Sequence, residues 1–162
     1  TSGGGRAATL YNGLTGAVLQ SFDTYLGNDS GWVYDVLPLG DLDGDGGPDF
    51  VLCVGSDDNA VYAVAGDKTG VHHDELWRFA GLDAFFSMAR IGDVNDDGKD
   101  DFAAASGDFA NRVYGISGAD GAELWSQNVV ESPFHMASYP DTDGDGLDEL
   151  VVGVWNWVRA SL

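Results

Sequence analysis

Apolar runs and acidic loops alternate along the chain in a pattern that repeats about every fifty residues. Each copy contains an apolar run, an acidic loop, a second apolar run, a turn, an alternating strand, another turn and a Trp-containing strand. The acidic loops begin at Asp41, Asp93 and Asp141, which are 52 and then 48 residues apart. Such a period is typical of repeat architectures in which each copy is one supersecondary unit.

Four strands joined by short turns or loops are predicted in each full copy. In the middle copy they cover residues 85–91, 102–106, 112–116 and 122–126. In the first copy they cover 32–39, 50–55, 60–65 and 75–79, with a longer last turn that contains His72 and His73. In the third copy, strands are predicted over 134–138 and 150–154, and another begins near 157–162. At the other end of the chain, residues 7–11 and 17–22 match the last two strands of a preceding copy.

Four-stranded antiparallel units at this spacing are typical of β-propeller blades, which stack face to face around a central channel. We therefore expect an all-β fold with about three blades' worth of chain. The expected divisions are 1–30 for strands three and four of a preceding blade, 31–81 and 82–130 for two blades, and 131–162 for a partial blade. Because propellers close with about four to eight blades, these blades would belong to a larger propeller, which we favour, or to one that further copies complete.

The three acidic loops follow one nine-residue motif, D-x-[DN]-x-D-G-x-x-[DE], over residues 41–49, 93–101 and 141–149. Oxygens at positions one, three, five and nine, with the backbone carbonyl at position seven, can converge on one hard cation, and the glycine at position six permits the sharp turn. The predicted ligands are Asp41, Asp43, Asp45, Gly47 and Asp49; Asp93, Asn95, Asp97, Lys99 and Asp101; and Asp141, Asp143, Asp145, Leu147 and Glu149.

Calcium is the expected ion, with about three sites. An irregular, mostly protein-made oxygen cage suits calcium, whereas magnesium prefers to keep water, and loops without His or Cys disfavour zinc and copper. An EF-hand begins the same way but needs a Glu at position twelve and then a helix. Position twelve here is Leu52, Ala104 or Val152, in apolar β-like runs. The alternative is that the loops are solvated acidic turns.

Charge and cysteine content limit the possible partners. The chain has 27 acidic and seven basic residues, a net charge of −20, and 14 of the acidic residues lie in the three loops. This argues against nucleic acid or an anionic membrane as partner, because both require Lys/Arg surfaces, and no stretch approaches the roughly 18 apolar residues of a membrane span. Cys53, the one cysteine, lies in an apolar run and is predicted to be a buried small hydrophobe.

The loops and their flanks resemble the FG-GAP repeats of integrin α-chain propellers and their bacterial secreted relatives. The matching positions are Gly40-Asp41, Gly92-Asp93 and the apolar Phe50, Phe102 and Leu150 after the loops. The resemblance implies a seven-bladed fold with calcium in strand-to-strand loops. The Phe-Gly and Gly-Ala-Pro signatures of the family are largely missing, with Cys53-Val54-Gly55 and Ala105-Ser106-Gly107 in the latter place.

Two segments, 65–77 and 117–125, also resemble the fourth-strand motif of quinoprotein-like propellers, in which the turn and a Trp lock neighbouring blades together. We expect Trp77 and Trp125 to make this repeated structural contact. The resemblance does not imply a quinone cofactor.

Other candidate chemistry is sparse. His72 and His73 lie in a predicted irregular, polar loop, where a plain surface role is favoured over a metal or acid–base site. His135, between Phe134 and Met136 in a predicted inner strand, is favoured as a channel-lining or packed residue, and it is the best single candidate for a ligand contact. Because no nucleophile elbow, phosphate-cradling motif or Cys-x-x-Cys pair is present, we expect a protein that is not an enzyme.

Three functions follow from these patterns. The first is a calcium-stabilised adhesion, scaffolding or assembly module outside the cell, because extracellular modules bind calcium at about 10⁻⁴ to 10⁻³ M. The second is part of a secreted polysaccharide-active or oxidising enzyme, or a carbohydrate-binding module that uses Trp32, Tyr34, Trp155 and Trp157. The third is a self-assembling protein in which partial propellers complete one another. Expected partners are other blades or copies of the chain, and a protein or carbohydrate ligand.

Overall fold

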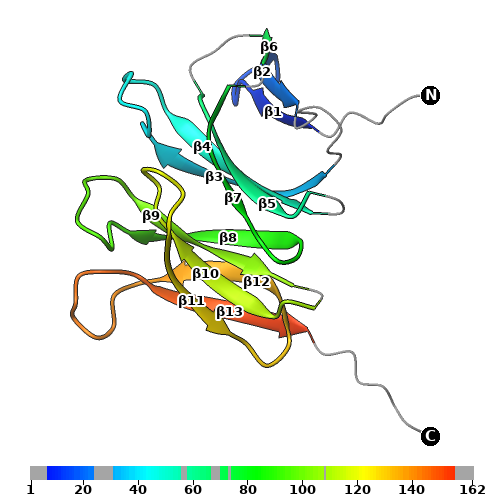
Figure 1. The fold of residues 1–162 in the computed structure, drawn as a ribbon. Coiled ribbons are helices and arrows are strands. Elements are labelled where there is room, and N and C mark those ends of the chain that lie inside the picture. The colour runs from blue at the N-terminus through cyan, green and yellow to red at the C-terminus, as the bar shows by residue number, and fades with distance from the viewer. Residues whose placement is uncertain are drawn as a thin grey trace, which may run out of the picture.

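The computed structural model describes residues 7–23, 31–55, 58–66, 70–72, 74–107 and 109–155. These residues form four β-sheets and no helix (Figure 1). Accordingly, no helix that could cross a membrane is found within the described ranges.

Sheet A contains β1 (Ala7–Tyr11), β2 (Val18–Asp23) and β6 (Gly70–His72); sheet B contains β3 (Trp32–Gly40), β4 (Asp49–Gly55), β5 (Ala60–Val64) and β7 (Glu75–Ala80). Sheet C contains β8 (Phe85–Gly92), β9 (Asp101–Ser106), β10 (Arg112–Ile116) and β11 (Glu123–Asn128), and sheet D contains β12 (Ser132–Tyr139) and β13 (Glu149–Trp155). Sheets B and C are antiparallel with strands in sequence order, so the prediction of four-stranded antiparallel units is confirmed.

The segment at His72 differs from the prediction of an irregular loop. Residues Gly70–His72 form β6, which pairs in parallel with β2, so that Gly70 lies opposite Gln20. This pairing ties the long connection between β5 and β7 to sheet A. His73 and the strand expected near 157–162 lie outside the described residues.

The sheets stack face to face, and apolar side chains fill the space between them (Figure 1). In sheet B the side chains alternate strictly: Val51 and Cys53 pack in the layer shared with sheet C, while Leu52 and Val54 pack with Phe22 of sheet A. This period of two is what a strand buried on both faces requires. Cys53 is fully buried, and burial raises the pKa of its thiol, so its predicted role as a small hydrophobe is confirmed.

The first strands of successive sheets are joined by side chains at one repeated position. The Met88 amide donates a hydrogen bond to the Asp35 carboxylate at 2.8 Å, and the Met136 amide donates to the Ser87 hydroxyl at 3.1 Å. The acceptors Asp35 and Ser87 are 52 residues apart, and the next equivalent position is His135. These contacts place β3, β8 and β12 in one row.

A β-bulge precedes each of these positions and aims an aromatic ring at the neighbouring strand. The bulged residues are Tyr34, Phe86 and Phe134. Ring centroids are 4.9 Å apart between Tyr34 and Phe86 and 4.6 Å apart between Phe86 and Phe134. The bulges therefore build an aromatic row across three sheets, which continues to Trp155 at 5.5 Å from Phe134.

Trp77 locks sheet B to sheet C. Its indole N–H donates a hydrogen bond to the Gly118 carbonyl at 3.0 Å, and its ring stacks on Phe102 at 6.1 Å. The ring also lies on Gly121, where a Cβ atom would be only 2.6 Å from the indole. The blade-locking role predicted for Trp77 is thus confirmed.

Replacing Trp77 by Phe should lower the free energy of unfolding by about 1–2 kcal/mol, because the Gly118 carbonyl loses its donor and the ring loses area. Urea unfolding followed by circular dichroism measures this difference. The control is Glu75→Gln on the same strand, an exposed position that should change stability by less than about 0.5 kcal/mol. If both substitutions lowered the free energy of unfolding by the same amount, the contact of Trp77 with sheet C would not have the stabilising role described.

Candidate metal centres

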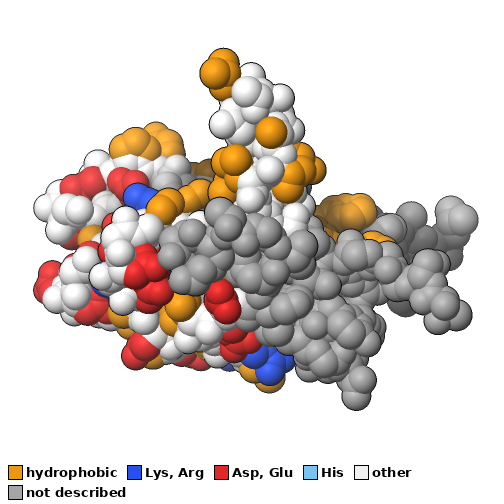
Figure 2. Space-filling model, turned by 90° about the horizontal axis from the view of Figure 1, so that it is seen from above, with side chains coloured by type: hydrophobic (Ala, Val, Ile, Leu, Met, Phe, Trp, Pro, Cys, Tyr) orange, Lys and Arg blue, Asp and Glu red, His pale blue; other side chains and the backbone are white. Residues whose placement is uncertain are grey.

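The three acidic loops lie on one side of the molecule, where they join β3 to β4, β8 to β9 and β12 to β13 (Figure 1). Figure 2 shows acidic side chains gathered toward the left of the view from above. Neighbouring loops touch: the Lys99 ammonium donates to the Asp41 carbonyl of the loop before it. In each case a strand follows the loop directly, so the loops are not EF-hands.

The first carboxylate of each loop organises the turn. In loop 41–49, the two oxygens of Asp41 accept hydrogen bonds from the Gly44 amide at 2.7 Å and the Gly46 amide at 3.0 Å. Both glycines have positive φ, 84° and 91°, which explains why the motif places glycine there. Loop 141–149 repeats the pair of bonds from Gly144 and Gly146 to Asp141, also at 2.7 and 3.0 Å.

Loop 93–101 uses the same scheme with one strained residue. The Asp97 and Gly98 amides donate to the Asp93 carboxylate at 2.9 and 2.8 Å. Asp96 has a φ of 60° at the fourth position, where the other two loops have glycine. A non-glycine residue in this region costs about 1 kcal/mol, so the bonds to Asp93 must offset that cost.

The fifth carboxylate supports the second half of each loop. Asp45, Asp97 and Asp145 accept hydrogen bonds from the amide two residues later, at 2.7, 2.9 and 2.9 Å. The bond from the Lys99 amide, followed by one from Asn95, holds the pKa of Asp97 below its ordinary value. A backbone amide thus fixes the position of each of these three carboxylates.

The ninth carboxylate has a structural role that the motif alone did not predict. Asp49 is buried, and its two oxygens accept hydrogen bonds from the Leu42 amide at 2.7 Å and the Gly66 amide at 2.8 Å. Asp101 makes the same bonds with Val94 at 2.8 Å and Gly118 at 3.0 Å. This carboxylate therefore joins the start of the loop to the turn after the third strand.

Burial of this group is costly, as the Asp101 carboxyl shows. Burial raises its pKa above the ordinary value, although the hydrogen bonds from Gly118 and Val94 act in the opposite direction. Gly118 must be glycine, because a Cβ atom there would lie 2.1 Å from the Asp100 carbonyl oxygen. A Cβ atom at Gly66 would likewise lie 1.9 Å from the Pro48 carbonyl oxygen.

The third loop has the same start but an incomplete end. The Thr142 amide donates to Oε1 of Glu149 at 2.7 Å, and the Thr142 hydroxyl bonds the same oxygen, which lowers the pKa of Glu149. Oε2 of Glu149 is shielded from solvent and has no hydrogen-bond partner among the described residues. No described residue gives Glu149 the bond that Gly66 and Gly118 supply in sheets B and C.

Carboxylates converge in two of the loops. Asp41, Asp43 and Asp49 each present an oxygen within 4.8 Å of the others, and Asp141, Asp143 and Glu149 do the same. Asn95 occupies the third position of loop 93–101, and its side-chain amide oxygen can also coordinate a cation. A set of hard oxygens on a preorganised turn fits calcium better than zinc or copper.

The other predicted site residues lie apart from the loops. His135 is exposed on β12, next to the bulge of the inner row. His72 lies in β6, and Trp157 is outside the described residues. Trp32 and Tyr34 are exposed at the start of β3, with ring centroids 6.4 Å apart.

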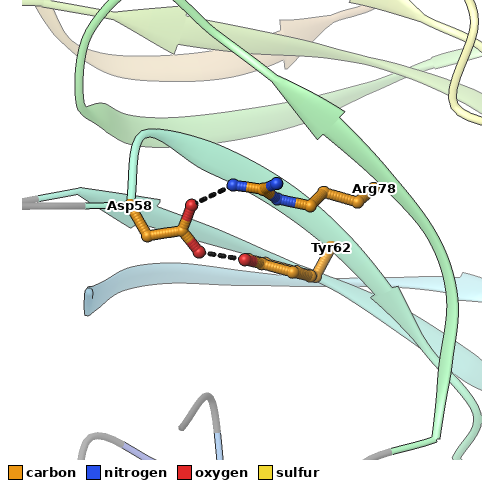
Figure 3. A network of polar contacts seen from close by, with 3 residues as sticks. All are labelled: Asp58, Tyr62 and Arg78. Atoms are coloured by element: carbon orange, nitrogen blue, oxygen red, sulfur yellow. Dashed lines mark hydrogen bonds and ion pairs between the residues drawn. The ribbon is translucent and has the colours of Figure 1, made fainter. Parts of the chain in front are cut away.

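A buried carboxylate in the connection between β4 and β5, Asp58, was missed at the sequence level. Its two oxygens bind the Tyr62 hydroxyl and the Arg78 guanidinium (Figure 3). Tyr62 on β5 lies opposite Arg78 on β7, so the network fixes the pairing of these strands. Burial, followed by the bond to Asp58, raises the pKa of the Tyr62 hydroxyl above its ordinary value. Asp58, Tyr62 and Arg78 come together only through the pairing of β5 with β7, which is why no spacing rule finds the network.

Comparison with known proteins shows the fold. No family model and no curated protein matches the chain. A crystal structure of BBS1N in complex with ARL6DN, soaked with mercury, matches with a TM-score of 0.62 at 12% identity, covering 93% of this chain and 41% of that one. A crystal structure of the same complex soaked with lead matches with a TM-score of 0.42 at 13% identity, covering 93% and 56%.

The chain is therefore an all-β module built of four-stranded β-propeller blades, and it spans less than half the length of the first of these structures. The structure with which it shares this fold is that of BBS1N in complex with ARL6DN.

Replacing Asp49 by Ala should cost about 2–4 kcal/mol in the free energy of unfolding even with excess EDTA, because the Leu42 and Gly66 amides lose their acceptor. Asp43→Ala, in the same loop but exposed, should cost less than about 1 kcal/mol under the same conditions. Denaturant melts with and without calcium measure both. If the two variants were equally stable in EDTA, the ninth carboxylate would be a ligand only.

The hydrogen bond from the Tyr62 hydroxyl to Asp58 should make a pH-dependent contribution to the free energy of unfolding. The raised pKa of this hydroxyl means that the unfolded chain loses the proton first, so the contribution is complete below about pH 10 and is lost as the pH rises further. Tyr62→Phe should be less stable than wild type by about 1–2 kcal/mol at pH 8, and the difference should shrink toward pH 11. A difference that stays constant over this range would contradict the assignment. Guanidinium melts of both proteins give the comparison.

Proposed function

We propose that the chain is a calcium-binding propeller module that works outside the cell by binding other proteins, in adhesion, scaffolding or assembly. The observation that carries this proposal is the repetition of one hydrogen-bonded acidic loop at the same place in three successive sheets, with converging carboxylates in two of them. A single acidic turn has many uses, but three in register imply one structural ion per blade.

The loops have a physical need for a cation. Like charges within about 4–6 Å repel by a few kcal/mol per pair at an effective dielectric near 20, and the grouped carboxylates lie within 4.8 Å of one another. Amide donors offset part of this repulsion, but each oxygen keeps a lone pair for a ligand. The side-chain oxygens of positions one, three, five and nine, which are carboxylates except at Asn95, would hold the ion together with the carbonyl of position seven. The ion would neutralise the carboxylates and stiffen the turn.

An extracellular location follows from this chemistry. Oxygen sites in extracellular modules bind calcium at about 10⁻⁴ to 10⁻³ M, a concentration found outside cells and not in the cytosol. The similarity of the loops to FG-GAP repeats of integrin α-chains and bacterial secreted proteins supports the same location.

A protein is the favoured partner. The structural neighbour was crystallised as BBS1N in complex with ARL6DN, so this type of fold supports protein binding. With a net charge of −20, the surface favours a partner with exposed Lys and Arg and disfavours nucleic acid.

Carbohydrate binding is the second candidate, and the aromatic row favours it. Trp32 and Trp155 are 55% and 48% exposed, and flat aromatic surfaces of this kind suit sugar rings. A change in Trp fluorescence on titration with oligosaccharides, abolished by Trp32→Ala, would favour this function over protein binding.

Calcium should raise the melting temperature strongly. At one hundred times the dissociation constant each site adds roughly 2.7 kcal/mol, so three independent sites add about 8 kcal/mol, or more than about 10 °C. Differential scanning calorimetry in 10 mM CaCl₂ against EDTA measures the shift, with equimolar MgCl₂ as the ion control and Asp141→Asn as the single-site control. Coincident melts in CaCl₂ and EDTA would refute the structural role of calcium.

A further inference from the structure

Lys99 is the single basic residue in the three acidic loops, which contain 14 acidic residues. It stands at the seventh position of loop 93–101, where its backbone amide donates a hydrogen bond to Asp97 at 2.9 Å. Its side chain leaves that loop, and the ammonium donates to the carbonyl of Asp41, the first residue of loop 41–49. The main chain of Lys99 therefore belongs to one candidate cation site, and its charge lies against another.

The contact falls on the residue that organises loop 41–49. The Asp41 carboxylate accepts hydrogen bonds from two glycine amides of the loop, and it converges with the carboxylates of Asp43 and Asp49. The Lys99 ammonium is bonded to the same Asp41 residue through its carbonyl. A positive charge at this place attracts the carboxylates of the loop and repels a second cation.

The seventh side chain also reaches the preceding loop at the boundary between sheets C and D, but there it carries no charge. Leu147, the seventh residue of loop 141–149, lies against Gly92, where a Cβ atom would be 3.3 Å from Cδ2 of Leu147. Gly92 directly precedes loop 93–101. The fold thus brings the seventh side chain to the start of the preceding loop in both cases, and the sequence decides whether that side chain is apolar or cationic.

A second basic residue, Arg90, crosses the same boundary between sheets B and C as Lys99, and its charge is already paired. Its guanidinium forms an ion pair with Asp100 at 2.9 Å and donates to the Pro38 carbonyl at 3.1 Å. The Lys99 ammonium instead contacts a carbonyl, and no ion pair with a carboxylate neutralises it within the described part of the chain. Lys99 thus brings an unpaired positive charge to loop 41–49.

The charge of Lys99 should outweigh its hydrogen bond in the effect on a bound cation. The Asp41 carboxylate is already held by the two glycine amides, and Asp49 accepts the Leu42 amide at 2.7 Å and closes the loop. One further hydrogen bond to the loop therefore adds little order. By contrast, charges of +1 and +2 about 8 Å apart repel enough, at the dielectric constant of water, to lower an affinity about fivefold.

We propose that Lys99 acts as a resident cation on loop 41–49, where its ammonium lowers the affinity of the loop for a divalent cation. This role rests on the calcium binding proposed above and adds regulation to it. By linkage, a cation in loop 41–49 must weaken the hold of Lys99 on Asp41 by the same factor. Calcium would therefore loosen this link between sheets B and C while it orders the loop itself.

Calcium titration of the 162-residue chain in 0.1 M KCl, followed by ¹H–¹⁵N correlation spectra, reads two loops separately. The Gly44 and Gly46 amides bond the Asp41 carboxylate and report on loop 41–49, whereas the Gly144 and Gly146 amides bond Asp141 and report on loop 141–149. Lys99→Met removes the charge and keeps an unbranched side chain. It should lower the calcium concentration at the Gly44 and Gly46 midpoint about fivefold, and leave the Gly144 and Gly146 midpoint within about twofold of wild type.

Two further substitutions separate the charge of Lys99 from its hydrogen bond. Lys99→Arg keeps the charge, so its Gly44 midpoint should match that of wild type, whereas Lys99→Gln keeps a donor without the charge and should behave like Lys99→Met. In 1 M KCl, where the Debye length is about 3 Å, the difference between wild type and Lys99→Met should shrink toward zero. A role in loop geometry alone would not respond to salt in this way.

Three results would overturn this role of Lys99. The first is a Gly44 midpoint that is unchanged or higher in Lys99→Met, which would mean that the ammonium is neutral toward the ion or helps to bind it. The second is an equal shift of the Gly44 and Gly144 midpoints, which would be a general effect of net charge. The third is a Lys99→Arg variant that behaves like Lys99→Met, which would assign the effect to side-chain shape.

Failure of calcium binding itself is distinguishable in the same spectra. In that case neither pair of glycine amides shifts in any variant, and both the calcium sites and their regulation by Lys99 are refuted. If both pairs shift but the Gly44 midpoint does not respond to Lys99→Met, calcium binding stands and only the role of Lys99 fails.

Discussion

One buried carboxylate in each complete blade holds together three parts of the fold. Asp49 and Asp101 accept hydrogen bonds from the start of the acidic loop and from the turn after the third strand. The loop is thereby closed into a compact ring of oxygens, and the second and third strands are tied at their ends. A buried anion is costly unless it is fully hydrogen-bonded, so the glycines that bring their amides close to it are as necessary as the carboxylate.

Contacts between blades repeat with the same period as the loops, which makes stability a sum of terms between neighbours. The Trp77 lock, the amide bonds from Met88 and Met136 and the apolar layers each connect one sheet to the next. Among the residues that the structure describes, none of these contacts reaches beyond the adjacent sheet. The half-blades at the two ends therefore lack what the central sheets have on both faces.

The sequence predicted most of the strands because alternating apolar residues and glycine-containing turns are local signals. It also predicted the loops, since their spacing carries the chemistry. It missed β6, which pairs in parallel with a strand about fifty residues earlier, and it missed Asp58, whose partners are joined only by strand pairing. The need for glycine at Gly118 arises from a carbonyl 18 residues away, and no local pattern indicates that contact.

Cation binding by loop 141–149 and the addition of further strands to sheet D would be coupled through Glu149, the ninth residue of that loop. Glu149 stands half-buried at the free edge of sheet D, whereas Asp49 and Asp101 are enclosed by the third strand and its turn. Any strand that completes sheet D desolvates Glu149, which is unfavourable for an anion beside Asp141 and Asp143. If the loop binds a cation as proposed, the ion would remove this penalty, and a completed sheet would in turn fix the carboxylate for the cation. By linkage each event must strengthen the other by the same factor, so the third loop should depend on its neighbours more than the first two do.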